Sequence, residues 1–338
     1  MVFSGLCFNT QSTQDIWWSG RGGYTMPAAF MTPAEEQTAL QSFRSQNAEL
    51  FQKKDSLLIL HLTIVLFLLA AGTWASVMTP FLWAHIVLGI INAFFWFSLI
   101  NVTIHHHQTH RNAAQSAGCK NFLNALYAIS VPNAPKRLNR YTRAHLNHHA
   151  RPFDETDVDH HFGTTHFLEM MKKPWTKLLY FLELTFVGGY VPGWEDDRYM
   201  NQVPLEQWNQ KDYEAVKAVE RRKALKTAAW QWGLFGVALV FLPRIAWGWA
   251  FPMLLVKNWA HFLGQFQHYD DTLRGNGRSI NRRTKTYHIP GWLNYLAGGE
   301  ISGHFLHHLF PEIPYYNVER ARKRFVKDPE CARLFAIY

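Results

Sequence analysis

The amino-acid sequence predicts an all-α integral membrane protein with about four transmembrane helices in two hairpins. Interfacial helices and a cytoplasmic histidine-rich helical domain complete the predicted fold. Two observations support this fold class. Apolar residues gather in long segments with few or no charges, and clusters of histidine lie next to those segments or in the loop between the hairpins.

The first hairpin is predicted between residues 56 and 110, because this stretch contains no Asp, Glu, Lys or Arg. As a continuous helix it would be about 80 Å long at ~1.5 Å per residue. A hydrocarbon core is roughly 30 Å thick and needs about 20 apolar residues to cross. The stretch therefore fits two crossings, and Pro80 is a suitable turn residue between them.

The second hairpin is predicted between residues 227 and 267, where the apolar pattern is interrupted by Pro243 and Arg244. A weaker apolar segment, WTKLLYFLELTFVGGYVPG, carries Lys177 and Glu183. Charges at these positions suit a helix that lies at the membrane interface better than one that crosses the membrane.

Basic residues lie almost entirely outside the two hairpins, in segments such as KAVERRKALK and RARKRFVK. The positive-inside rule places such segments in the cytoplasm. With four crossings, both termini and the histidine clusters then lie on the cytoplasmic side. The net charge of +9 is explained by loops near anionic lipid, so no nucleic-acid partner is expected.

The domain limits follow from the two ends of the chain. Residues 1–31 have no basic start followed by an apolar core, so a flexible tail is expected rather than a signal peptide. Thr32, Pro33 and Glu35 form the pattern of a capping box at the start of a helix. We therefore expect one domain over residues 32–325 and a C-terminal tail over residues 326–338.

Three short motifs concentrate the histidines: HHQTH, HLNHH and HFLHH. Histidines three or four positions apart share one face of an α-helix, so each motif can direct its imidazoles toward one point. Histidines at a bilayer boundary are costly and tend to mark function. The candidate ligands are His106, His110, His145, His148, His149, His304, His307 and His308.

Eight convergent imidazoles are too many for one metal ion of ordinary coordination, and they fit two. Imidazole suits zinc, copper, iron and nickel. The chain has no HExxH motif of hydrolytic zinc enzymes and no Glu-x-x-His pair of carboxylate-bridged di-iron bundles. These observations favour an all-histidine dinuclear iron site for oxygen chemistry. Asp157 and Glu300 are candidates to orient the imidazoles.

The segment HFLHHLFPEIPYYNVERA closely resembles the third histidine box of acyl-lipid desaturases. The order of the three boxes around two membrane hairpins, over roughly residues 50–325, resembles the membrane-bound fatty acid desaturase and hydroxylase superfamily. The resemblance implies two irons, O2 as co-substrate and a ninth histidine on the last membrane helix. His268 is the better match for this ligand by its distance from the third box, and His261 is the second.

The first box departs from the family pattern, because His107 stands where Asp or Glu usually follows the first histidine. Two registers are open. One pairs His106 with His110, and the other pairs His105 with His110 at the HxxxxH spacing of other family members. We favour the register that begins at His106.

The resemblance implies O2-dependent oxidation of an unactivated C–H bond in a fatty acyl chain, with desaturation as the first expectation. The alternatives are a hydroxylase or ketolase, or an oxidative decarboxylase that makes a terminal alkene from a free fatty acid. Expected partners are a fatty acid, acyl carrier or acyl-lipid substrate, membrane lipid, and an electron donor with its reductase. Since no HPGG haem motif is present, the donor is expected to be separate, of the ferredoxin, rubredoxin or cytochrome b5 type.

Two further expectations concern the substrate head group and the non-enzymatic alternatives. Arg140 and Arg143 precede the second box and could hold an anionic head group. A metal transporter would place its histidines along a path at mid-membrane, whereas these lie at the predicted cytoplasmic exits. A receptor with a structural metal site would consume no O2.

Overall fold

The computed structural model describes residues 32–130, 134–150, 170, 172–187, 210–256, 287 and 289–335. Every element in these ranges is helical. The chain divides into two compact units, one of residues 1–46 with 325–338 and the other of residues 47–324. The N-terminal helix therefore groups with the C-terminal segment, and the domain limits expected from the sequence stay a prediction.

The small unit contains α2 (Pro33–Gln46) and α16 (Pro329–Phe335). The capping box predicted at the start of α2 is present. The Thr32 amide donates to Glu35 Oε2 at 2.6 Å, and the Glu35 amide donates to Thr32 Oγ1 at 3.3 Å. Phe43 packs edge to face on Phe325, with ring centroids 5.1 Å apart.

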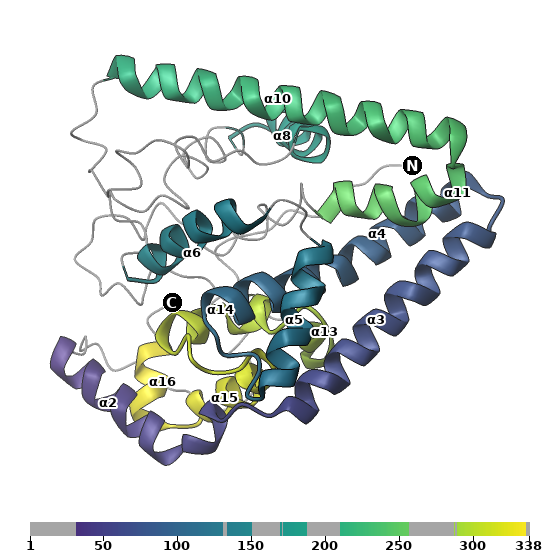
Figure 1. The fold of residues 1–338 in the computed structure, drawn as a ribbon. Coiled ribbons are helices and arrows are strands. Elements are labelled where there is room, and N and C mark those ends of the chain that lie inside the picture. The colour runs from purple at the N-terminus through teal and green to yellow at the C-terminus, as the bar shows by residue number, and fades with distance from the viewer. Residues whose placement is uncertain are drawn as a thin grey trace. The chain divides into compact units, whose positions relative to one another are not determined.

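The first predicted hairpin is present as α3 (Asp55–Met78) and α4 (Leu82–Ile100), which follow the short helix η1 (Ala48–Phe51). The two helices run side by side and join at a short turn that contains Pro80 (Figure 1). Their shared face forms the main apolar core, which includes Leu62, Val65, Trp96 and Leu99. Large apolar side chains on their outer faces, such as Phe67 and Trp83, are exposed, as lipid-facing residues would be.

The second predicted hairpin is described in part. Helix α10 (Gln210–Phe241) ends just before α11 (Pro243–Ile245), which leads into the π-helix η4 (Ala246–Ala250). Helical structure continues to residue 256, and the remainder of the fourth predicted crossing lies outside the described residues.

In the described part, three helical segments are long and apolar enough to cross a membrane: residues 55–78, 82–109 and 221–241. The chain therefore has the character of a multi-pass membrane protein. The segment predicted to lie at the interface is a helix, α8 (Pro174–Phe186). Its Trp175, Leu178 and Phe181 side chains are exposed.

Helix α4 continues into η2 (Asn101–Thr109), which is a π-helix rather than an α-helix. After it come α5 (Ala117–Ser130) and α6 (Ala134–Ala150). The Asp55 carboxylate at the start of α3 accepts hydrogen bonds from the amides of Gln115 and Ser116, at 2.7 and 2.9 Å. This contact fixes the start of α5 against the start of α3.

The third histidine segment lies on α14 (Glu300–Leu309), between α13 (Gly291–Leu296) and α15 (Tyr315–Phe325). Gly298 and Gly299 form the turn before α14 with φ of 78° and 80°, a region that strongly favours glycine. The side-chain oxygen Oδ1 of the buried Asn294 accepts from the amides of Ile301 and Ser302, at 3.1 and 2.9 Å. The orientation of α14 is therefore fixed by a tight turn and a side-chain cap.

Candidate metal centre

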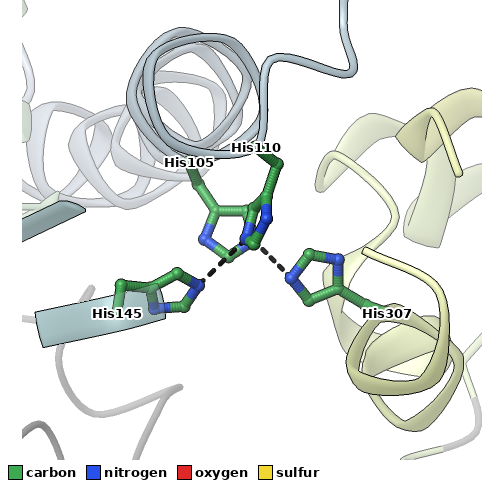
Figure 2. Close-up of side chains that lie close together, drawn as sticks. All are labelled: His105, His110, His145 and His307. Carbon is green, nitrogen blue, oxygen red and sulfur yellow. Dashed lines mark hydrogen bonds between the residues drawn. The ribbon is translucent and has the colours of Figure 1, made fainter. Parts of the chain in front are cut away.

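Four imidazoles from three separate segments converge at the end of η2 (Figure 2). One potential ligand nitrogen from each of them lies within 4.8 Å of the others. The Nε2 atoms of His105 and His307 are 2.8 Å apart, and those of His110 and His145 are 3.1 Å apart. The helices η2, α6 and α14 thus bring together residues up to 202 positions apart in the sequence.

A second set of imidazoles adjoins the first. His149 lies between the two sets, because its ring centroid is 4.6 Å from that of His110 and 4.2 Å from that of His308. His308 in turn lies 4.9 Å from His148 and 4.7 Å from His304, again between ring centroids. Eight imidazoles therefore form one continuous cluster: His105, His110, His145, His148, His149, His304, His307 and His308.

The π-helix explains which histidine of the first box joins the cluster. In a π-helix the hydrogen bonds connect residues five positions apart, so side chains at i and i+5 become neighbours across one turn. The His110 amide donates to the His105 carbonyl at 3.0 Å, and the two rings lie 4.8 Å apart. The expected pairing of His106 with His110 assumed an α-helix, in which i and i+4 share a face.

His106 lies beside the cluster with its nitrogens directed at oxygen atoms. Its Nε2 is 3.0 Å from the Gly298 carbonyl oxygen, so this nitrogen carries the hydrogen and donates it. Its Nδ1 is 3.3 Å from Asn112 Oδ1. The geometry favours the register that begins at His105, while the His106 assignment itself stays a prediction. His107 points elsewhere, with Nε2 3.0 Å from Asn124 Oδ1.

Six of the eight imidazoles are buried, and burial lowers the pKa of the other two, His110 and His149. Burial, followed by the proximity of His307, holds the pKa of His110 well below its ordinary value. The same two causes, in the same order, lower the pKa of His149. A neutral imidazole has a lone pair to offer a metal, whereas a protonated one has none.

The donor set fits transition-metal ions. Two imidazole nitrogens at right angles on one ion, each about 2.1 Å from it, would be about 3 Å apart. Four Nε2 pairs in the cluster have this spacing, including His145 with His149 at 3.0 Å and His304 with His308 at 3.2 Å. Imidazole nitrogens packed this closely suit metal ions that several of them bind together.

Several sequence-predicted residues cannot be compared with the structure. His261, His268 and Asp157 lie outside the described residues, and the side chains of Glu300 and Arg140 are outside the description as well. Arg143 is exposed on α6, two residues before His145. The ninth ligand, the two acidic residues and the head-group contacts therefore stay predictions.

Two polar neighbours of the cluster were not predicted from the sequence. Tyr141 stacks on His145, with ring centroids 5.4 Å apart, and its hydroxyl lies 3.4 Å from His105 Nδ1. Its position four residues before His145 on one helix is a signal that could have identified it. Asn112 contacts His106, and no spacing rule would have singled it out.

Two comparisons with known proteins bear on the chain. The sequence profile of the fatty acid desaturase family matches residues 81–336, about three quarters of the chain and all three histidine segments. No curated protein matches the chain significantly over any part of it. The match covers the helices that build the imidazole cluster. The chain therefore belongs to the fatty acid desaturase family.

Proposed function

We propose that the protein uses O2 to oxidise an unactivated C–H bond of a fatty acyl chain, and that it introduces a double bond there. Membership of the family implies an oxidoreductase. The observation that carries the proposal is the convergence of eight imidazoles, six of them buried, from η2, α6 and α14 next to membrane-type helices.

The cluster would hold two irons in two overlapping sets of ligands. We assign His105, His110, His145 and His307 to one set, because their nitrogens meet at one point. His148, His304 and His308 form the other set, with His149 between the two and His268, or else His261, completing it. Iron bound here would supply O2 reduction and the oxidising power to remove hydrogen from a methylene group.

The remaining residues would orient ligands, exclude water and position the substrate. Burial of most of the imidazoles would keep bulk water from the oxidising centre. Asp157 and Glu300 would accept hydrogen bonds from imidazole N–H groups and fix the ring orientations. Arg140 and Arg143 would hold an anionic substrate head group at the cytoplasmic surface.

The substrate would be a fatty acid, an acyl carrier conjugate or an acyl-lipid that the membrane delivers. The electrons would come from a separate donor of the ferredoxin, rubredoxin or cytochrome b5 type. Desaturation removes two hydrogens and reduces O2 to water with two further electrons and two protons, so a donor with its reductase is required. The termini and the site would lie on the cytoplasmic side.

Gas chromatography with mass spectrometry would test the proposal on cells that express the protein, with both lipid extract and headspace sampled. Wild type is compared with His148→Ala and with His85→Ala, a matched control on α4 whose ring contacts Ser76 rather than the cluster. We expect a new unsaturated acyl chain in wild type and in His85→Ala, and none in His148→Ala.

Other products would redirect the proposal in defined ways. A hydroxylated or oxidised chain would indicate a hydroxylase or ketolase, and a volatile terminal alkene would indicate oxidative decarboxylation. A product that persists in His148→Ala would contradict the assignment of the cluster as the catalytic centre.

A further inference from the structure

We propose that Asn112 is a positioning residue that locks the first and third histidine segments into the arrangement that binds metal. This inference rests on the proposed function, because it assumes that the imidazole cluster holds metal ions. Asn112 is 1% exposed and lies two residues after the ligand candidate His110. Its amide connects that segment to the chain that follows α14.

The Asn112 amide has a defined orientation. Its Nδ2 donates to the carbonyl oxygens of Pro311 and Ile313, at 2.7 and 3.1 Å. Because both partners only accept hydrogen bonds, the nitrogen must be on this side and Oδ1 on the other. Pro311 is three residues after His308, so these bonds hold the chain next to the third histidine segment.

The backbone of Asn112 holds the first segment, through its amide. Oδ1 lies 3.3 Å from His106 Nδ1, and the Asn112 backbone amide donates to the His106 carbonyl at 3.0 Å. His106 Nε2 is in turn bound to the Gly298 carbonyl in the turn before α14. One asparagine and one histidine thus bridge the end of η2 to both ends of α14.

The backbone before Asn112 has the conformation that this bridge requires. Arg111 has φ of 54°, and it is the one residue other than glycine with positive φ in the described part of the chain. A left-handed residue ends η2 sharply and turns Asn112 back toward the protein interior. Backbone strain of this kind persists where the surrounding contacts determine it.

The bridge directs the imidazoles of His105 and His106 toward different partners. With His106 held against Gly298 and Asn112, the neighbouring His105 faces His307, with Nε2 atoms 2.8 Å apart. Loss of the bridge would let η2 shift relative to α14 and would widen this approach. Metal affinity and turnover should therefore depend on Asn112 more strongly than stability does.

The test is a titration of the metal-free full-length protein, in detergent micelles, with Co²⁺ as a spectroscopic probe. Wild type is compared with Asn112→Asp, which retains the shape and an acceptor oxygen but cannot donate to Pro311 and Ile313. The matched control is Asn317→Asp. Asn317 is 5% exposed and donates to the Leu50 carbonyl at 2.9 Å, a partner that lies outside the cluster.

We expect Asn112→Asp to weaken Co²⁺ binding by about 10- to 100-fold and to alter the visible absorption bands of bound Co²⁺. With iron bound, kcat should fall by a similar factor while KM stays within about twofold. Asn317→Asp should lower the melting temperature and leave both the Co²⁺ spectrum and kcat unchanged.

Three results would overturn the inference: wild-type Co²⁺ affinity and kcat in Asn112→Asp, an equal loss in Asn317→Asp, or an Asn112→Asp protein that does not fold. The last would make the residue a general structural one. Wild-type protein that gives no spectrum of nitrogen-bound Co²⁺ would contradict the proposed function as well, so the two failures are distinguishable.

Discussion

Helices η2 and α14 both deliver histidines to the same cluster, yet they do so with different backbone geometry. In α14 the histidines follow α-helical spacing, and His304 and His308 approach across one turn at i and i+4. In η2 the π-helix moves the neighbouring pair to i and i+5, so His105 rather than His106 meets His110. The difference shows that a histidine motif acquires its register from the helix that carries it.

The two helices are also fixed in place by different structural features. Helix α14 needs the Gly298–Gly299 turn and the Asn294 cap at its start, whereas η2 needs the left-handed Arg111 and the Asn112 bridge at its end. Each helix is therefore fixed at the end where the chain changes direction. The imidazoles lie between these fixed points and are held close to one another. No flexible loop separates a candidate ligand on η2 or α14 from the point that fixes its helix.

The largest effect should come from removing a ligand candidate on α14. His307→Ala deletes an imidazole that lies within reach of His105, His110 and His149. We expect activity to fall by more than about 100-fold, since changes outside the ligand set already cost 10- to 100-fold. Product analysis measures the loss, and membrane extraction with circular dichroism checks that the helices still insert. Turnover close to wild type would show that His307 is no ligand.

A smaller effect is expected at the ninth ligand, which lies outside the described residues. His268→Ala should lower bound iron more than His261→Ala, because His268 better matches the family spacing to the third box. Iron per chain, determined by plasma emission spectroscopy, provides the comparison. Equal iron content in the two variants would leave neither residue as the favoured ligand.

The turn before α14 offers a comparison of two glycines. In Gly299→Ala the new Cβ would lie 2.7 Å from the Tyr315 carbonyl oxygen at a φ of 80°. We expect a destabilisation of about 1–3 kcal/mol. Gly118→Ala in α5, where nothing lies within 4 Å of the new Cβ, should instead stabilise by about 0.5–1 kcal/mol. Melting temperatures that shift in the same direction would contradict the described turn.

The smallest effect concerns pH. Because the folded-state pKa of His110 lies below its unfolded value, the unfolded chain binds a proton first as the pH falls. The metal-free protein should therefore be most stable above about pH 6.5 and lose stability progressively below it. Thermal melting from pH 8 to pH 5 measures this slope, and His110→Ala should flatten it. An identical slope in that variant would show that His110 does not contribute.

Much of this arrangement could be predicted from particular residues. The uncharged stretch from residue 56 to residue 110 predicted α3 and α4, and Thr32 with Glu35 predicted the start of α2. The HxxHH motifs predicted that the histidines of α6 and of α14 share one helix face, because α-helical spacing is readable from sequence. These successes rest on local patterns with one dominant physical cause.

The remainder depends on long-range contacts that no local pattern encodes. The π-helical form of η2 is stabilised by partners far along the chain, such as Ala297 for Asn101 and Pro311 for Asn112. For the same reason the grouping of α2 with residues 325–338 was not foreseen. It depends on contacts between the two ends of the chain, such as that of Phe43 with Phe325.

The most direct test of the account is the iron content of protein purified from iron-rich medium, compared among wild type, His105→Ala and His106→Ala. We predict about two irons per chain in wild type, since eight convergent imidazoles exceed the needs of one ion. His105→Ala should lose most of this iron, while His106→Ala should keep most of it and lose activity to a lesser degree. Full iron content in His105→Ala, with loss in His106→Ala, would contradict the π-helical register and the metal centre built on it.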